Sequence, residues 1–147
     1  MSQMLAMYSS VGNVQFSKMV SQVAPFFSTI DATFQALRPG YAEATMPFRR
    51  EITNHLGTVH AIAMCNMAEL VGGTVTDASI PAGARWIPKA MSVEYLAKAK
   101  TDLRGVADGA NVDWSQPGDV VVTVDVFDTA GTKVFTARIT MDVKHAA

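Results

Sequence analysis

The chain has 147 residues, 49% of them hydrophobic and 17% charged, and a formal net charge of −1 at pH 7. This length and composition predict one folded domain with a substantial core and exclude an intrinsically disordered protein. The near-neutral charge excludes a general electrostatic surface for nucleic acids and a polybasic membrane anchor, so we expect neither partner.

The cysteine content and the apolar segments indicate a compartment. Cys65 is the one cysteine in the sequence and cannot form an intramolecular disulfide, which suits a reducing environment. The first ten residues, MSQMLAMYSS, lack the cationic and long apolar regions of a secretory signal. The most apolar window, AIAMCNMAELV, is too short to cross a bilayer and contains Asn66 and Glu69. We therefore expect a cytoplasmic protein. Three His and one Cys with unsuitable spacing predict no metal site.

The N-terminal part of the chain has a helical pattern. Residues 13–27, NVQFSKMVSQVAPFF, place apolar side chains three and four positions apart, which predicts an amphipathic helix with Pro25 near its end. We treat residues 1–27 as a helical extension of the domain.

Strand patterns dominate the rest of the sequence. Residues 28–37 and 41–48 are strand-like, and the turn sequence RPG between them predicts a hairpin. After a helical segment, period-two patterns predict four more strands at residues 90–100, 102–112, 119–127 and 133–143. Strands outnumber helices and do not alternate with them, which predicts an α+β fold over residues 1–147. We expect an antiparallel sheet of about six strands wrapped around one long buried helix.

That helix, predicted at residues 58–71 and ended by Gly72-Gly73, contains an unexpected carboxylate. Glu69 stands among apolar residues, where an unpaired charge is costly to desolvate. Asn66 lies one turn earlier on the same face, and Ile62 another turn back. Burial raises the pKa of a carboxyl group towards the range in which a general base works near neutral pH. The alternatives are a Glu held by a structural hydrogen bond, or one on the single exposed stripe of the helix.

The residues that enter this helix carry a resemblance. The pattern N-x-x-G-T-x-H runs from Asn54 through Gly57 and Thr58 to His60, and Glu69 follows nine residues after the His. It resembles the hotdog-fold acyl-CoA thioesterases, in the branch of the phenylacetate-degradation thioesterases and thioesterase superfamily member 2, and within it an uncharacterised subgroup. The order of elements is similar over residues 28–144. The resemblance implies a hotdog fold, a homodimer with two composite sites, and no cofactor beyond the CoA carried by the substrate.

The resemblance also implies roles for individual residues. Glu69 matches the acid that activates water or attacks the thioester carbonyl, and Asn54 matches the residue that orients water or substrate. Ala61 matches the first Gly of an H-G-G signature, whose backbone N–H polarises the carbonyl. Ile62 replaces the second Gly and adds bulk, which bears on the size of the acyl group. Pro88 stands where the branch often has a Ser or Thr hydroxyl, so Asn54, Asn66 or His55 would have to hold the water.

Geometry along the helix predicts a shared site. Ala61 and Glu69 are eight residues apart, about 12 Å along a helix axis. A carbonyl-binding amide and an attacking base must each lie within about 3 Å of the reacting centre, so one subunit cannot supply both. We therefore expect the site at a homodimer interface, in a dimer or a dimer of dimers.

Further residues are assigned by the same pattern. His60 has two interpretations, a brace for the loop or a proton-transfer group. His55 precedes Glu69 by 14 residues, a spacing that resembles hotdog hydroxyacyl-thioester dehydratases, although their intervening Pro-Gly is absent. A cluster of basic residues is a candidate for the CoA phosphates: Lys89, Lys98, Lys100 and Arg104. The predicted substrate-binding set is Gly57, Thr58, Ile62, Asn66, Pro88, Lys89, Met91 and Lys98.

The sequence thus favours a thioesterase that hydrolyses acyl-CoA or a related thioester. The rival interpretation is a non-catalytic acyl-thioester binding protein. Pro88 and the Ala61-Ile62 pair favour the rival, whereas the retained Asn54 and Glu69 oppose it.

Overall fold

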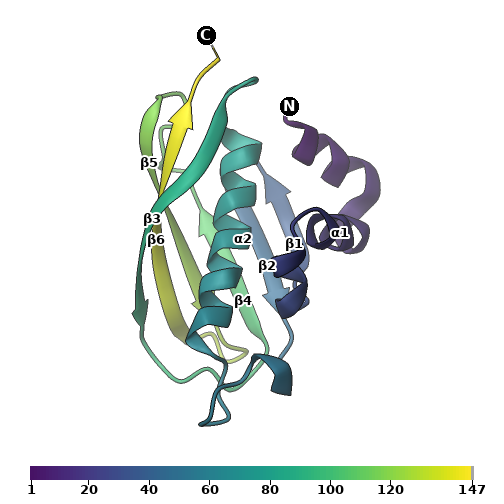
Figure 1. Ribbon diagram of the computed structural model, residues 1–147, viewed down its shortest axis with the longest axis vertical. Helices are drawn as coiled ribbons and strands as arrows, with labels where there is room; N and C mark the ends of the chain where they lie inside the picture. The colour runs from purple at the N-terminus through teal and green to yellow at the C-terminus, as the bar shows by residue number, and fades with distance from the viewer. Residues whose placement is uncertain (147) are drawn as a thin grey trace.

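The computed structural model describes residues 1–146 (Figure 1). Two 3-10 helices, η1 (Pro25–Ile30) and η2 (Arg50–Ile52), join longer elements. The helices are α1 (Gln3–Val23) and α2 (Ala61–Ser79), and the strands are β1 (Thr33–Arg38), β2 (Tyr41–Met46), β3 (Arg85–Tyr95), β4 (Leu103–Asp108), β5 (Gly118–Phe127) and β6 (Lys133–Lys144).

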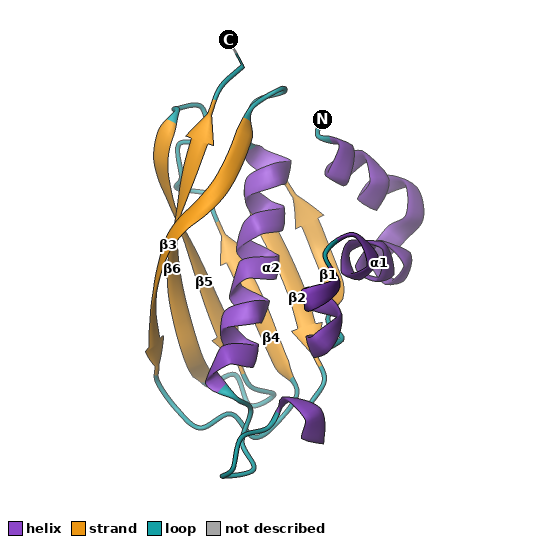
Figure 2. Cartoon of the chain, in the orientation of Figure 1, coloured by secondary structure: helices purple, strands orange, loops and turns teal. Residues whose placement is uncertain are grey.

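The six strands form one antiparallel sheet that curls around α2 (Figure 2). The strand order is β1-β2-β4-β5-β6-β3. Strand β6 shows how the sheet faces the helix, because its buried and less buried residues alternate. Val134 is buried, and so are all the residues predicted to face the core: Phe135, Ala137, Ile139, Met141 and Val143. The prediction of an α+β hotdog architecture is confirmed.

Helix α2 differs from its prediction at both ends. It begins at Ala61 rather than residue 58, and it continues through Gly72-Gly73 to Ser79, so the prediction that the glycines end the helix is wrong. The glycines serve close packing instead. A Cβ at Gly72 would lie 2.9 Å from Ile139 Cδ1, and one at Gly73 would lie 2.8 Å from the Trp86 ring. The sheet approaches the helix backbone where there is no side chain to hold it away.

The N-terminal region contains more helix than its pattern predicted. Helix α1 begins at Gln3 and turns sharply at Gly12, whose φ of +79° breaks it into two arms. The second arm is fixed to β1, because Ser17 Oγ accepts a hydrogen bond from Phe34 N at 2.8 Å. The Phe16 ring packs edge-on against Phe34, with their centroids 5.0 Å apart.

Several strand boundaries also differ from the sequence prediction, and β3 ends at Tyr95 rather than residue 100. Helix η1, with Pro25 at its start, takes up the beginning of the predicted strand 28–37, so β1 starts only at Thr33. Strand β4 ends at Asp108, and β3 begins at Arg85 rather than residue 90. Pro88 is tolerated in β3 because the strand lies at a sheet edge and the register shifts beside it.

The free edge of β3 is apolar and exposed. The side chains of Ile87, Met91 and Tyr95 are 62%, 41% and 55% exposed, and Leu96 directly after the strand is 49% exposed. An edge strand with unpaired backbone groups and apolar side chains is a template for pairing with another chain. Within residues 1–146, no helix is long and apolar enough to cross a membrane.

Candidate functional site

A pocket of about 340 Å³ lies at the start of α2. We call it the helix-start pocket. It brings together four of the predicted site residues: Asn54, Thr58, Ala61 and Lys98. Tyr95 and Leu96, at the end of the exposed edge strand, form its other side.

The loop before α2 is held in shape by Asn54. Its Oδ1 accepts hydrogen bonds from Leu56 N at 2.9 Å and Thr58 N at 3.2 Å, and its Nδ2 donates to Thr58 Oγ1 at 2.9 Å. Gly57 completes the turn with a φ of +76°, a conformation that side chains disfavour. An amide nitrogen carries two hydrogens, so one donor of Asn54 is left for another partner. Asn54 organises the loop that positions the helix start.

The helix start itself presents one free backbone donor. His60 is the N-cap, and its Nδ1 accepts a hydrogen bond from Ile62 N at 3.0 Å. This contact braces the helix start and occupies one ring nitrogen. The next amides, those of Ala63 and Met64, donate to His60 O. Among residues 1–146, no group accepts a hydrogen bond from the Ala61 N–H, which lies at the positive end of the helix dipole.

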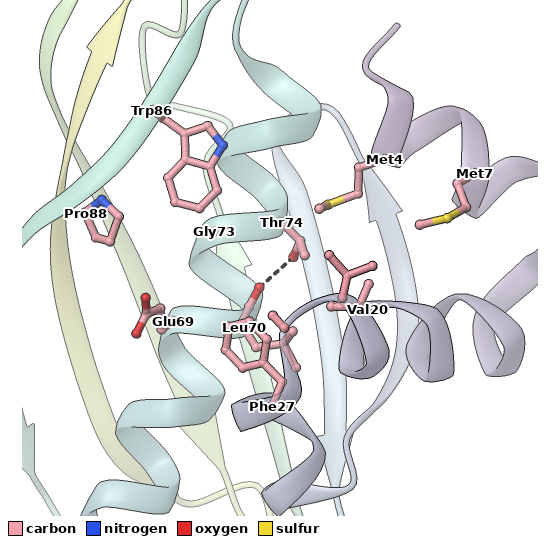
Figure 3. A pocket seen from close by; sticks show the side chains of 12 residues that line it. Met4, Met7, Val20, Phe27, Glu69, Leu70, Gly73, Thr74, Trp86 and Pro88 are labelled. Atoms are coloured by element: carbon pink, nitrogen blue, oxygen red, sulfur yellow. Dashed lines mark hydrogen bonds between the residues drawn. The ribbon is translucent and has the colours of Figure 1, made fainter.

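A second pocket, of about 290 Å³, lies at the middle of α2, and we call it the α1 pocket (Figure 3). Helix α1 lies along one side of it and β3 along the other, and Glu69 and Pro88 stand on the β3 side. Two predicted site residues therefore meet here, in a different pocket from Asn54 and Ala61.

The expectation that Glu69 is buried is wrong for the single chain. Its side chain is exposed, as is that of Ile62, seven residues earlier on the same stripe of the helix. The sheet and α1 cover the rest of α2 but leave this stripe open beside the apolar edge of β3. The alternative recognised from the sequence, a carboxylate on the one exposed stripe, is the arrangement observed. Desolvation of Glu69 therefore requires a second chain or a substrate.

Asn66, predicted to contact substrate, has a structural contact instead. Its Nδ2 donates to Phe26 O at 3.3 Å and to Thr29 Oγ1 at 3.1 Å, which holds η1 against α2. Its Oδ1 is buried and has no partner among the described residues. Together with His60 and Ile62 it lines a third, smaller pocket of about 180 Å³ that does not include Glu69.

The predicted basic cluster does not form one surface. Lys89 Nζ lies 2.8 Å from Asp119 Oδ1, and this hydrogen bond and charge raise the Lys89 pKa. Arg104 is paired with Glu43 at 2.9 Å. Lys98 lines the helix-start pocket, and no carboxylate of residues 1–146 lies within ion-pair distance of it.

The remaining predicted residues are spread over the surface. Met91 projects from the exposed β3 edge, and His55 is exposed at the loop tip and lines none of the pockets described above. Cys65 is half-buried, and burial raises the pKa of its thiol, which makes it a poor nucleophile. Within residues 1–146, no three His, Cys, Asp or Glu side chains gather as metal ligands would.

The sequence interpretation missed the wall of the α1 pocket. Met4 and Met7 line it from the first arm of α1, and Trp86 lines it from β3. The spacing of Met4, Leu5, Met7 and Tyr8 is helical and could have predicted the first arm. Nothing in the local pattern connects that arm to Glu69.

The chain is similar to one protein family and to several solved structures. The model of the family described as "Domain of unknown function (DUF4442)" matches residues 12–143. No curated protein matches the chain. The structural-genomics protein APC5556 is 58% identical with a TM-score of 0.90, and the match covers 98% of this chain and 97% of that protein.

Two thioesterase structures are more distant. The thioesterase HI1161 from Haemophilus influenzae is 16% identical with a TM-score of 0.75, over 88% of this chain and 90% of its own. A thioesterase family protein from Silicibacter pomeroyi is 19% identical with the same TM-score, over 88% of this chain and 96% of its own. At such low identity these likenesses show a shared fold.

Proposed function

This chain belongs to the DUF4442 family and has the hotdog fold of the thioesterase superfamily, and from that premise we propose that it hydrolyses acyl-CoA thioesters at two sites shared across a homodimer. One observation carries the proposal. A free backbone donor at one pocket and a carboxylate at another stand eight residues apart on the same helix, about 12 Å along its axis.

The exposed edge of β3 supports the dimer. Pairing of two β3 strands around a two-fold axis would cover Ile87, Met91 and Tyr95, which are apolar and exposed in the single chain. The exposed stripe of α2 lies beside that edge. The same pairing would shield Glu69 from water and bring it towards the partner's helix start.

In the proposed reaction, the thioester oxygen accepts a hydrogen bond from Ala61 N–H of one subunit. This donor and the helix dipole stabilise the negative charge that develops on the oxygen. Glu69 of the other subunit either takes a proton from a water that attacks the carbonyl carbon or attacks that carbon itself. A new C–O bond forms, the C–S bond breaks, and the products are the free acid and CoA thiol. Lys98 lies where it can bind a CoA phosphate.

The decisive experiment measures thiol release from a panel of acyl-CoA thioesters. Glu69→Gln keeps the size of the side chain and removes the charge, so we expect at least a 100-fold loss of kcat. Asp31→Asn is the control, because Asp31 is an exposed carboxylate that lines none of the three pockets described above, and we expect wild-type rates. Wild-type rates no faster than those in buffer for every thioester would refute the proposal.

A specific observation favours a second candidate, a non-catalytic acyl-thioester binding protein. Pro88 stands beside Glu69 in the α1 pocket and offers no hydroxyl to hold a water (Figure 3). A binding protein would retain acyl-CoA affinity without thiol release. A dehydratase would release no thiol, so it is tested separately by following the enoyl absorbance of 3-hydroxyacyl and enoyl thioesters, whose interconversion His55→Ala would abolish.

A further inference from the structure

Resting on the proposed thioesterase function, we propose that α1 forms the outer wall of the acyl site and selects an uncharged acyl chain of about eight to ten carbons. The α1 pocket carries this inference. It lies beside Glu69, and both arms of α1 contribute to its wall, Met4 and Met7 from the first arm and Val20 from the second (Figure 3).

The chemistry of the lining indicates an apolar ligand. Among the described lining residues, Glu69 is the one that carries a charge. The two polar side chains in the wall already have partners inside the chain: Thr74 Oγ1 donates to Leu70 O at 2.9 Å, and Trp86 Nε1 donates to Asp77 Oδ1 at 3.3 Å. An acyl chain with a hydroxyl or a distal carboxylate would lose its hydration without gaining a hydrogen bond.

The volume sets the length. A methylene group takes up about as much space as one water in the liquid, about 30 Å³. The pocket of about 290 Å³ therefore holds on the order of ten such groups. Each methylene that is buried raises binding about fourfold, so the preference should climb steeply with length until the pocket is full.

The position of α1 makes it the adjustable wall. Strand β3 belongs to the sheet and α2 packs against it, so both are fixed by the core. The first arm of α1 lies before the break at Gly12, outside this core layer. Tyr8 holds the first arm to the second, because its hydroxyl donates to Asn13 Oδ1 at 2.7 Å and its ring packs edge-on against Phe16 with the centroids 5.2 Å apart. The first arm presents two methionines, whose flexible side chains adapt to ligand shape. An acyl chain longer than the pocket holds must displace this arm of α1.

The test compares kcat/KM for saturated acyl-CoA thioesters from two to sixteen carbons. We expect a rise of about fourfold per methylene and an optimum at roughly eight to ten carbons. Met4→Trp fills part of the pocket, so it should lower kcat/KM for decanoyl-CoA at least tenfold more than for butyryl-CoA. Val14→Trp is the matched control on the same helix, because Val14 is 60% exposed and lies outside the pocket, and the optimum should not move. A ten-carbon thioester with a distal carboxylate should react at least tenfold more slowly than decanoyl-CoA.

The outcomes separate this inference from the function on which it rests. Hydrolysis with a flat length profile, or an optimum that Met4→Trp does not move, overturns the inference and leaves the thioesterase intact. If no thioester is hydrolysed, the proposed function fails, and binding of decanoyl-CoA still decides the pocket. Trp86 in the pocket wall reports this binding in a Trp114→Phe background, where it is the only tryptophan. A saturable change in Trp86 fluorescence on addition of decanoyl-CoA would support the pocket as the acyl site. The absence of such a change would refute it.

Discussion

The substitution Ala61→Pro tests the proposed oxyanion donor with little disturbance of the fold. Ala61 is the first residue of α2, the position at which proline is favoured because that amide has no partner within the helix. The residue before a proline must be extended, and His60 already has φ −64° and ψ 136°. We therefore expect the free energy of unfolding to change by less than about 1 kcal/mol.

The expected loss of activity is large because proline has no N–H to donate. One backbone donor in an oxyanion site contributes roughly 100- to 1,000-fold to kcat. Ala61→Gly is the matched control, because it keeps the N–H and should stay within a few-fold of wild type. If the Ala61→Pro variant has the same kcat as the Ala61→Gly variant, this amide does not bind the thioester oxygen.

A mixture of two inactive variants then tests the shared site. In the proposed dimer, Ala61 and Glu69 of one composite site would come from different subunits, because they stand about 12 Å apart along α2. When Ala61→Pro and Glu69→Gln chains are refolded together in equal amounts, half of the dimers are mixed, and each mixed dimer has one intact site. Thiol release should recover to about one quarter of the wild-type rate. No recovery above the separate variants would exclude a site shared in this way.

Other consequences concern packing, the thiol and the CoA phosphates. Gly72→Ala should lower the free energy of unfolding in urea by about 1–2 kcal/mol, since its Cβ would meet Ile139 Cδ1 at 2.9 Å. This cost should be smaller in an Ile139→Val background. Stabilisation by alanine would contradict the packing. Burial raises the Cys65 pKa, so at pH 8 iodoacetamide should alkylate Cys65 more slowly than it alkylates a free thiol. The rise of the alkylation rate with pH should also occur at a higher pH for Cys65 than for the free thiol. Equal rates would contradict the raised pKa. Lys98→Gln should raise KM for acyl-CoA at low salt several-fold but leave acyl-pantetheine unaffected; equal effects on both would exclude phosphate binding.

Much of the architecture could be predicted because it depends on local periodicity. The alternation in residues 133–143 identified the face of β6 that packs in the core, since a strand points successive side chains to opposite sides. The motif from Asn54 to His60 marked the entry to the helix, which begins directly after it at Ala61, and the structure gives these residues the contacts that shape that entry. Their catalytic roles stay predictions.

The tertiary structure alone decided which stripe of α2 is covered and what surrounds it. The sequence places Glu69 among apolar neighbours, yet exposure depends on elements that are distant in the chain, and these leave its side of the helix open. Gly72 and Gly73 resemble a helix end, but contacts with Ile139 and Trp86 make them packing positions inside the helix. The α1 pocket joins the first arm of α1 to the middle of α2, more than sixty residues apart in the chain. Local sequence patterns predict the conformation of a segment, whereas the packing of the whole chain determines which other segments it contacts.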